Sequence, residues 1–271
     1  MKKIAVLGPS GTYSDIAAKQ YLKNNNLDLE IVYYPSILRT INAVSEDTIA
    51  IVPFENTLDG FVFESLDGII ARNLHIASQS KLSIDFAFVS NNKNISDIKN
   101  VYCQFKAYGQ CLDFITNNNL NILRTQSNTE SLELINNSDD SYGAIIPVHT
   151  LSNNKYNIKM LHIADSQHNE TRFFIIEDAP SYNKLGSAVE ASVVVTATKD
   201  RPGLLFDILK EFHELDINLK SILSRPMKTE MGKYKFYIEC SLTNDQIHLL
   251  DDVKKNLKDY IVDILGIYNA I

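Results

Sequence analysis

Short apolar runs separated by amphipathic segments organise the N-terminal part of the chain. Runs at 3–7, 30–34 and 49–53 predict buried strands, and apolar residues at helical spacing follow each of them. Ser14 and Ser36 are the expected N-caps of the first two helices. The strand–helix–strand–helix–strand order predicts a parallel sheet with right-handed crossovers.

The middle of the chain repeats this α/β pattern. We expect one long strand at 76–89 that crosses out of the first lobe, then helices at 104–115 and 128–136. The remaining expected elements are strands ending at 101–102 and at 121–125 and 142–146, a short helix after Pro147 and an extended segment at 158–163. The chain then returns through a polar loop, Asn169–Phe173, into an apolar strand at 174–176. Two α/β lobes joined by crossing strands enclose a cleft, where small ligands bind.

A change of composition at 181–187 to Ser, Asn, Lys and Gly predicts a linker. The chain beyond it has the order βαββαβ, a ferredoxin-like plan. The expected strands are 191–198, 217–224, 233–242 and 260–268, and the expected helices are 203–215 and 245–257.

Composition narrows the class of protein. The chain has 271 residues, of which 45% are hydrophobic, and a formal charge of -7, enough for one large or two ordinary domains. An acidic chain without a basic run favours neither a nucleic-acid nor an anionic membrane partner. No apolar run reaches the roughly 18 residues of a membrane span, and Gly8–Gly11 cut short the N-terminal apolar run, so a cytoplasmic protein is expected.

The spacing of potential ligands predicts no metal and no cofactor. Three cysteines and six histidines show neither paired nor metal-ligand spacing. Residues 8–14 join a strand to a helix, and the start of such a helix is an anion site. The turn lacks the lysine of a P-loop and the third glycine of a dinucleotide fingerprint, so a small carboxylate is expected there.

Two further polar segments carry candidate chemistry. Thr171 can donate a proton or hydrogen bond at short range, and Asn56 and Thr57 can donate to a carboxylate. Glu55 is expected to orient its neighbours. Arg172 has two open interpretations, because it can bind a substrate carboxylate with two hydrogen bonds or lock its loop to a neighbouring acid.

Three segments resemble, in order and spacing, the motifs of the prephenate dehydratases: residues 8–14 (Gly-Pro-Ser-Gly-Thr-Tyr-Ser), 53–60 (Pro-Phe-Glu-Asn-Thr-Leu-Asp-Gly) and 169–173 (Asn-Glu-Thr-Arg-Phe). The C-terminal part is similar to an ACT domain. The resemblance implies an α/β fold: a two-lobed, type II periplasmic-binding-protein-like catalytic domain at 1–180, then a ferredoxin-like ACT domain at 190–271. Within the first, lobe 1 would cover about 1–77 and 164–180, and lobe 2 about 78–163. No chorismate mutase segment precedes Met1, so the monofunctional form is expected.

The resemblance also implies the activity and the residues that serve it. The expected reaction is conversion of prephenate to phenylpyruvate, carbon dioxide and water without a cofactor, in phenylalanine biosynthesis. The implied catalytic residues are Thr171, Asn56 and Gln110. The implied substrate-binding residues are Ser10, Gly11, Thr12, Glu55, Thr57, Cys103, Lys106, Asn169, Arg172 and Phe173. L-Phenylalanine is the expected effector, bound by Pro202, Gly203, Leu204, Leu205, Asn218, Leu223, Ser224, Arg225 and Pro226. A homodimer or homotetramer is expected.

The chain departs from the family pattern at two places. Cys103-Gln104-Phe105-Lys106 stands where the family commonly has Ser-His-Pro-Gln, so a hydroxyl becomes a thiol and an amide becomes a cation. Leu204 replaces a small residue, and Leu223 stands where the family has a glutamate. Two alternatives stay open. One is an arogenate dehydratase, because no residue decides between the two substrates; the other is a sensor that binds a small carboxylate or amino acid without turnover, for which the altered Cys103–Lys106 segment is the reason. Retention of Thr171, Asn169 and Asn56 together favours an enzyme, since a pure binder needs no donor to a leaving group.

Overall fold

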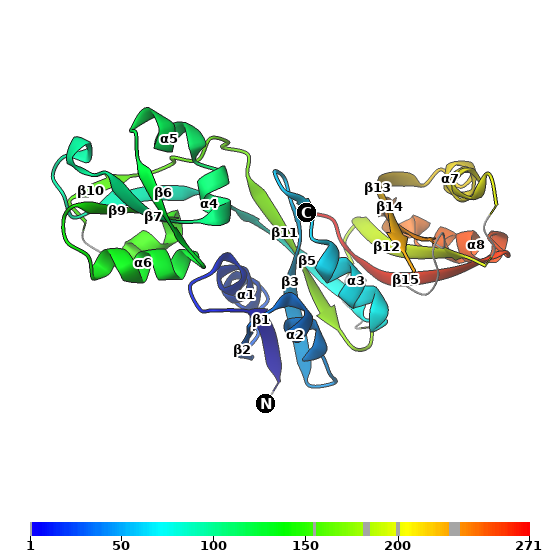
Figure 1. Cartoon of the computed structure of the whole chain (residues 1–271). Helices are drawn as coiled ribbons and strands as arrows, with labels where there is room; N and C mark the ends of the chain where they lie inside the picture. Colours follow the sequence, from blue (N-terminus) through cyan, green and yellow to red (C-terminus); the bar gives the residue numbers. More distant parts are fainter. Residues whose placement is uncertain (1, 154–155, 181–184, 199–200, 228–233) are drawn as a thin grey trace.

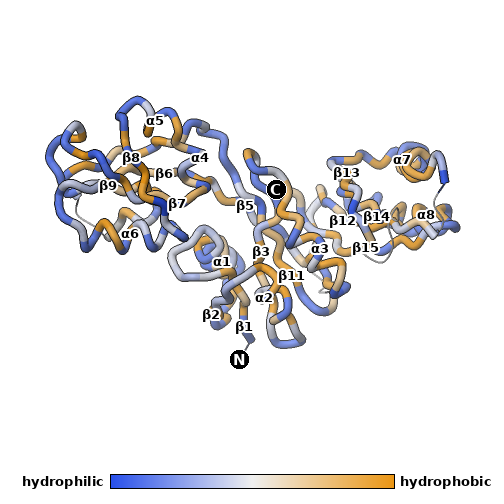
Figure 2. The backbone as a smooth tube through the Cα atoms, in the orientation of Figure 1, coloured by the Kyte–Doolittle hydropathy of each residue, from blue (hydrophilic) through white to orange (hydrophobic). Residues whose placement is uncertain are grey.

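Three sheets, each covered by helices, follow one another along the molecule (Figure 1). The structure is a computed structural model, and it describes residues 2–153, 156–180, 185–198, 201–227 and 234–271. Figure 2 shows hydrophobic residues along the inner strands and hydrophilic residues along the peripheral loops. Within the described residues, no helix is both long and apolar enough to cross a membrane.

The first lobe is built on the sheet with strand order β2-β1-β3-β11-β5, and β4 pairs with β3. Its elements are β1 (Lys3–Leu7), α1 (Tyr13–Asn24), β2 (Glu30–Tyr34), α2 (Ile37–Asn42), β3 (Thr48–Asn56), β4 (Gly60–Phe61), α3 (Phe63–Ala71), β5 (His75–Ser83) and β11 (Glu170–Glu177). Strands β1, β2 and β3 are parallel, as predicted. Strand β11 is antiparallel to both β3 and β5, so the returning chain completes the first sheet.

The second lobe is built on the sheet with strand order β10-β6-β9-β7-β8. Its strands are β6 (Phe86–Ser90), β7 (Asn100–Gln104), β8 (Asn121–Thr125), β9 (Tyr142–Pro147) and β10 (Ile158–Met160). Its helices are η1 (Ile95–Asp97), α4 (Phe105–Gly109), α5 (Leu112–Asn117), α6 (Asn128–Asn136) and η2 (Val148–Asn153).

The C-terminal unit has the predicted βαββαβ order, with strand order β13-β14-β12-β15. Its elements are β12 (Ala188–Ala197), α7 (Leu204–Glu214), β13 (Asn218–Pro226), β14 (Tyr234–Thr243), η3 (Asn244–Gln246), α8 (Leu249–Asn256) and β15 (Tyr260–Asn269). One face of its sheet packs with α7 and α8 around a separate core. The other face gives Val194, Tyr237, Leu265 and Tyr268 to the core of the first lobe, so the two units share one apolar interior.

The sheets of the C-terminal unit and the first lobe approach each other closely at Gly266. A Cβ at this position would lie 2.1 Å from the carbonyl oxygen of Ile76 on β5. Such a contact is far too short for any side chain, so glycine is required for β15 to lie against β5.

Several predicted elements differ from the observed ones. The single strand expected at 76–89 is two strands, because the chain leaves the first sheet after Ser83 and enters the second at Phe86. The helix expected at 104–115 is also two, since the chain turns at Gln110 and Cys111, and the one expected at 245–257 is a 3₁₀ turn followed by α8. Thr12, not Ser14, caps α1, because the extended backbone of Thr12 lets its hydroxyl accept from Asp15 N. Most of the expected linker, 181–184, lies outside the described residues.

Candidate active site

A cavity of about 450 Å³ lies between the first and second lobes. The first lobe contributes the β1–α1 turn, the end of β3 and the start of β11, and the second contributes α4 and the start of α6. Its polar wall includes Thr12, Tyr13, Ser14, Asn56, Asp59, Gln104, Lys106, Gln110, Gln126, Ser127, Asn128 and Thr171. A space of this size lies in the range of small-ligand pockets, roughly 300–1,000 Å³.

The turn before α1 is held from behind by Asp15, whose side chain is 1% exposed. Its carboxylate accepts hydrogen bonds from Gly11 N (2.7 Å), Ser10 Oγ (3.1 Å), Lys19 Nζ (2.8 Å) and the Tyr33 hydroxyl (2.7 Å). Burial raises the pKa of Asp15, but the hydrogen bonds from Gly11, Lys19 and Tyr33 and the Lys19 charge together hold it below its ordinary value. Ser10 and Gly11, both predicted to bind substrate, therefore bond to Asp15, whereas Thr12 lines the cleft.

Three buried amides form a chain of hydrogen bonds that ends at Thr171. Asn169 Nδ2 donates to Gln110 Oε1 (2.8 Å), and Asn56 Nδ2 donates to Asn169 Oδ1 (2.8 Å) and to Thr171 Oγ1 (2.9 Å). The Asn56 carbonyl accepts from Leu58 N and Asp59 N, each at 3.0 Å, which fixes which end of the amide donates. All three predicted catalytic residues and the predicted binding residue Asn169 thus meet in one network.

Thr171 and its neighbour Arg172 point to opposite sides of β11, because alternate residues of a strand face opposite ways. Thr171 and Phe173 line the cleft between the lobes. Arg172 lines a second cavity of about 270 Å³, between the first lobe and the C-terminal unit, together with Glu55 and Thr57. These three predicted substrate-binding residues therefore line the second cavity and not the cleft.

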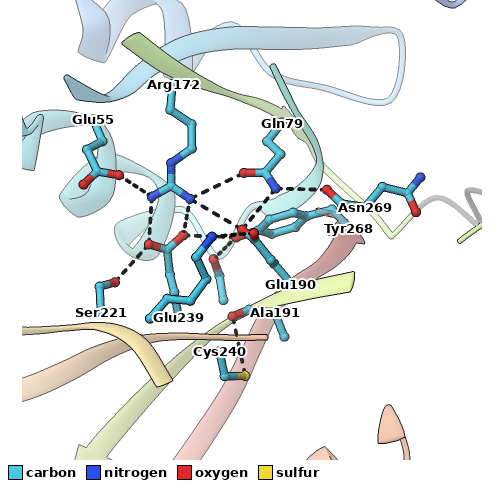
Figure 3. Close-up of polar contacts among 12 residues, drawn as sticks. Glu55, Gln79, Arg172, Glu190, Ala191, Ser221, Glu239, Cys240, Tyr268 and Asn269 are labelled. Atoms are coloured by element: carbon cyan, nitrogen blue, oxygen red, sulfur yellow. Dashed lines mark hydrogen bonds and ion pairs between the residues drawn. The ribbon is translucent and has the colours of Figure 1, made fainter. Parts of the chain in front are cut away.

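Arg172 is the centre of a buried ionic cluster (Figure 3). Its guanidinium donates to both oxygens of Glu239 on β14 (2.7 and 2.8 Å) and to Glu55 on β3 (2.7 Å). Burial lowers the pKa of Arg172, but the hydrogen bonds and charge of Glu239, with the charge of Glu55, raise it above its ordinary value. Of the two interpretations left open by the sequence, the contacts match the one in which Arg172 locks to neighbouring acids.

Thr57 ties together the two polar segments of the first lobe. Its hydroxyl donates to His168 O (2.9 Å) and accepts from Glu170 N (3.0 Å). These bonds join the end of β3 to the start of β11. The Thr57 hydroxyl therefore uses both its proton and its oxygen in bonds to the backbone.

The segment in which the chain leaves the family pattern divides between core and cleft. Cys103 is fully buried in the core of the second lobe, and burial raises the pKa of its thiol to about 12. It does not line the cleft, contrary to the expected substrate contact. Its neighbour Gln104 does, and Lys106 pairs across the cleft with Asp59 of the first lobe (3.2 Å).

The sequence interpretation predicted the helix at 128–136 but did not assign its start to the site. Ser127 caps α6, accepting from Glu130 N (3.0 Å), and Ser127 and Asn128 line the cleft opposite the cap of α1. The signal was present, because Ser127 follows a predicted strand and precedes a glutamate by three residues, as in a capping box.

The predicted effector residues fall at two places in the C-terminal unit. Pro202, Gly203, Leu204 and Leu205 lie at the start of α7, where Gly203 has φ +88°. Asn218, Leu223, Ser224, Arg225 and Pro226 lie on β13. Leu223 packs on the core of the first lobe, and Arg225 pairs with Asp67 of α3 (2.9 Å), so these two face the first lobe.

Comparison with known proteins agrees with this architecture. A family model of prephenate dehydratase matches residues 4–181, and a model of the ACT domain matches 191–257. Among the described residues, no three His, Cys, Asp or Glu side chains converge as metal ligands would.

Similar proteins cover almost the whole chain. A prephenate dehydratase of Methanocaldococcus jannaschii is 30% identical over 266 residues, covering 96% of this chain and 95% of the relative. One of Lactococcus lactis is 26% identical, covering 94% and 89%. The prephenate dehydratase structure of Staphylococcus aureus superposes with a TM-score of 0.82 at 28% identity, covering 98% and 100%. An Arthrobacter aurescens prephenate dehydratase in complex with L-Phe shares the fold, with a TM-score of 0.84 at 24% identity and coverage of 99% and 90%. The chain belongs to the prephenate dehydratase family.

Proposed function

We propose that the chain is a prephenate dehydratase in which Thr171 donates to the departing hydroxyl of the substrate. The observation that carries this role is the hydrogen bond from Asn56 Nδ2 to Thr171 Oγ1 (2.9 Å). Because the threonine oxygen accepts this bond, its own proton is free to be donated. Among the described residues no acceptor takes that proton, and Thr171 lines the cleft.

Prephenate carries two carboxylates. Among the described residues that line the cleft, the charged side chains are Lys106 and Asp59, which pair with each other. The helices that begin at the cavity include α1 from the first lobe, capped by Thr12, and α6 from the second, capped by Ser127. Backbone N–H groups at helix starts bind anions, so one of these starts would hold the carboxylate that the product keeps.

The reaction breaks two bonds that join the substrate ring to its substituents. The electrons of the bond to the ring carboxylate enter the ring as carbon dioxide leaves, and the carbon–oxygen bond of the hydroxyl breaks on the opposite side of the ring. The departing hydroxide takes up one proton, which Thr171 passes on and solvent water restores to it, and leaves as water. Thr171 stabilises the charge that develops on this oxygen, and one such donor is typically worth about 10²–10³ in rate.

Decarboxylation is easier in surroundings that do not solvate the carboxylate. Pro53, Val62, Ile84, Phe86 and Phe173 are apolar parts of the cavity lining. A carboxylate held against these side chains is poorly solvated as an ion, so its loss as neutral carbon dioxide is favoured.

Two substitutions at Thr171 test the proposal. Thr171→Ala is expected to lower kcat by about 10² or more, while Thr171→Ser, which keeps the hydroxyl, is expected to stay within about tenfold. Phenylpyruvate is measured by its absorbance in strong base after incubation with prephenate. Near-normal turnover in Thr171→Ala would remove Thr171 from this role. Product from arogenate and not from prephenate would move the proposal to arogenate as substrate.

Phenylalanine is the effector that we propose for the C-terminal unit, acting on a homodimer or homotetramer. In this proposal residues 1–180 form the catalytic domain and 190–271 the regulatory domain. The ACT match and the relative in complex with L-Phe support it. Activity that stays unchanged at millimolar phenylalanine would exclude feedback inhibition.

A further inference from the structure

Glu239 belongs to the C-terminal unit but lies directly behind the strand that carries Thr171. Its side chain is almost fully buried, and it accepts one hydrogen bond from each terminal nitrogen of Arg172, at 2.7 and 2.8 Å (Figure 3). A carboxylate and a guanidinium joined by two parallel bonds are fixed in orientation as well as in distance.

The same two strands hold the cleft pair and the ionic pair. In the register of β3 and β11, Thr171 lies opposite Asn56, and Arg172 lies opposite Glu55. The Asn56–Thr171 bond is on the cleft side (2.9 Å), and the Arg172–Glu55 bond is on the side of the C-terminal unit (2.7 Å). A movement of Arg172 therefore moves the backbone on which Thr171 depends.

On its own side, Glu239 is held by the neighbouring strands of the C-terminal sheet. Ser221 Oγ on β13 donates to it at 2.9 Å, and the Tyr268 hydroxyl on β15 lies at 3.3 Å. A second carboxylate, Glu190 on β12, lies 3.8 Å from Arg172 and is bonded by Lys220 (2.5 Å). All four strands of the C-terminal sheet thus reach the cluster around Arg172.

We propose that Glu239 is a positioning residue for the reaction: through Arg172 it fixes the Thr171–Asn56 pair, and it makes turnover depend on how the C-terminal sheet sits on the first lobe. This inference rests on the proposed function. Its physical reason is that a misplacement of about 1 Å in a reacting group can cost roughly 10²-fold in rate. Any effector that shifts β14 would act on Thr171 through this contact.

A second ion pair between the same two units provides a matched control. Arg225 on β13 donates to both oxygens of Asp67 on α3, each at 2.9 Å. It has the same bidentate chemistry and also joins the C-terminal unit to the first lobe, but α3 does not carry the cleft pair. Asp67→Asn therefore weakens the attachment of the unit without acting on the strand of Thr171.

The experiment compares Glu239→Gln, Glu239→Asp and Asp67→Asn in the full chain. Glu239→Gln is expected to lower kcat roughly tenfold or more with KM within about twofold, because alignment is lost and binding is kept. Asp67→Asn is expected to leave kcat within about twofold, and Glu239→Asp, which keeps the charge, to lie between them. Equal losses in Glu239→Gln and Asp67→Asn would reduce Glu239 to general docking and overturn the proposal.

A second readout does not depend on activity. Hydrogen exchange of peptides that contain residues 169–173 is expected to be faster in Glu239→Gln than in either Asp67→Asn or the wild type. Unchanged exchange in Glu239→Gln would overturn the positioning role whatever the kinetics. A wild type that makes no phenylpyruvate would sink the proposed function alone, since the exchange comparison still decides the role of Glu239.

Discussion

Replacing Asn56 by aspartate would reverse the hydrogen bond on which the proposed role of Thr171 depends. The substitution is nearly isosteric, and the bonds from Leu58 N and Asp59 N to Asn56 Oδ1 (both 3.0 Å) can persist. The donor is lost, however. A carboxylate beside Thr171 Oγ1 accepts the threonine proton, which then no longer points into the cleft.

The size of the effect follows from what each bond does. Losing one aligned donor to a developing oxyanion costs about 10²–10³ in kcat, or about 2.7–4 kcal/mol in the barrier. The free energy of unfolding falls by less than this, because Asn56 Nδ2 shares two protons among three acceptors, Asn169 Oδ1, Glu170 O and Thr171 Oγ1. We expect about 1–3 kcal/mol of destabilisation from the buried acceptors left without a donor.

The pH dependence of turnover distinguishes the loss of this hydrogen bond from a general loss of folded protein. Burial raises the pKa of a carboxyl group, and a protonated carboxyl can donate again. Turnover of Asn56→Asp should therefore recover partly as the pH falls, while that of the wild type does not rise with it. The assay is phenylpyruvate formation across pH, with unfolding by urea measured in parallel.

Asn128→Asp is the matched control for added charge. Asn128 lines the same cleft at the start of α6 but is not a partner of Thr171. It should raise KM for an anionic substrate with a smaller change in kcat. The reasoning would be refuted if Asn56→Asp kept turnover within a few-fold of the wild type, or if both variants lost kcat equally at every pH.

Two further predictions concern stability. The lowered pKa of Asp15 means that its ionised form stabilises the fold above the ordinary carboxyl pKa, and that this contribution is lost as the pH falls through the lowered value. Asp15→Asn should therefore cost about 2–3 kcal/mol in urea unfolding at pH 7 and progressively less below about pH 4; a difference independent of pH would contradict this. Gly266→Ala should destabilise the folded protein by about 1–3 kcal/mol or more, because the added Cβ meets Ile76 O. Gly109→Ala is the control and should not destabilise it, because the added Cβ meets nothing within 4 Å. Equal melting temperatures for the two variants would refute the close contact.

The order of elements was accessible from the sequence because it depends on local periodicity. Parallel strands end at one edge of a sheet, so the turn at 8–14 and the end of β3 could be expected to meet. The network of Gln110, Asn169, Asn56 and Thr171 matches the expectation that these residues lie together.

The failures also have local causes. The strand of Thr171 was expected to begin at 174, but it begins at Glu170, so Thr171 and Arg172 obey strand alternation and cannot share a site. Cys103 follows Val101 on the buried face of β7, which the same period of two would have indicated. The pairing of Arg172 with Glu239 had no sequence signal, because it joins side chains from two different sheets that are far apart in the sequence.

The alternation along β11 has an evolutionary consequence. Residues 171 and 173 face the substrate cleft, and residue 172 faces the C-terminal unit, on one continuous backbone. Single substitutions at neighbouring codons can therefore change the side chain on one face of the strand and leave the side chains of the other face as they are, without any change of loop length. Insertions and deletions are a different matter, since a shift by one residue would exchange the two faces and lose both properties at once. Point substitutions at residue 172 can therefore change the contact with the C-terminal unit, while the alternation of side chains along the strand stays the same.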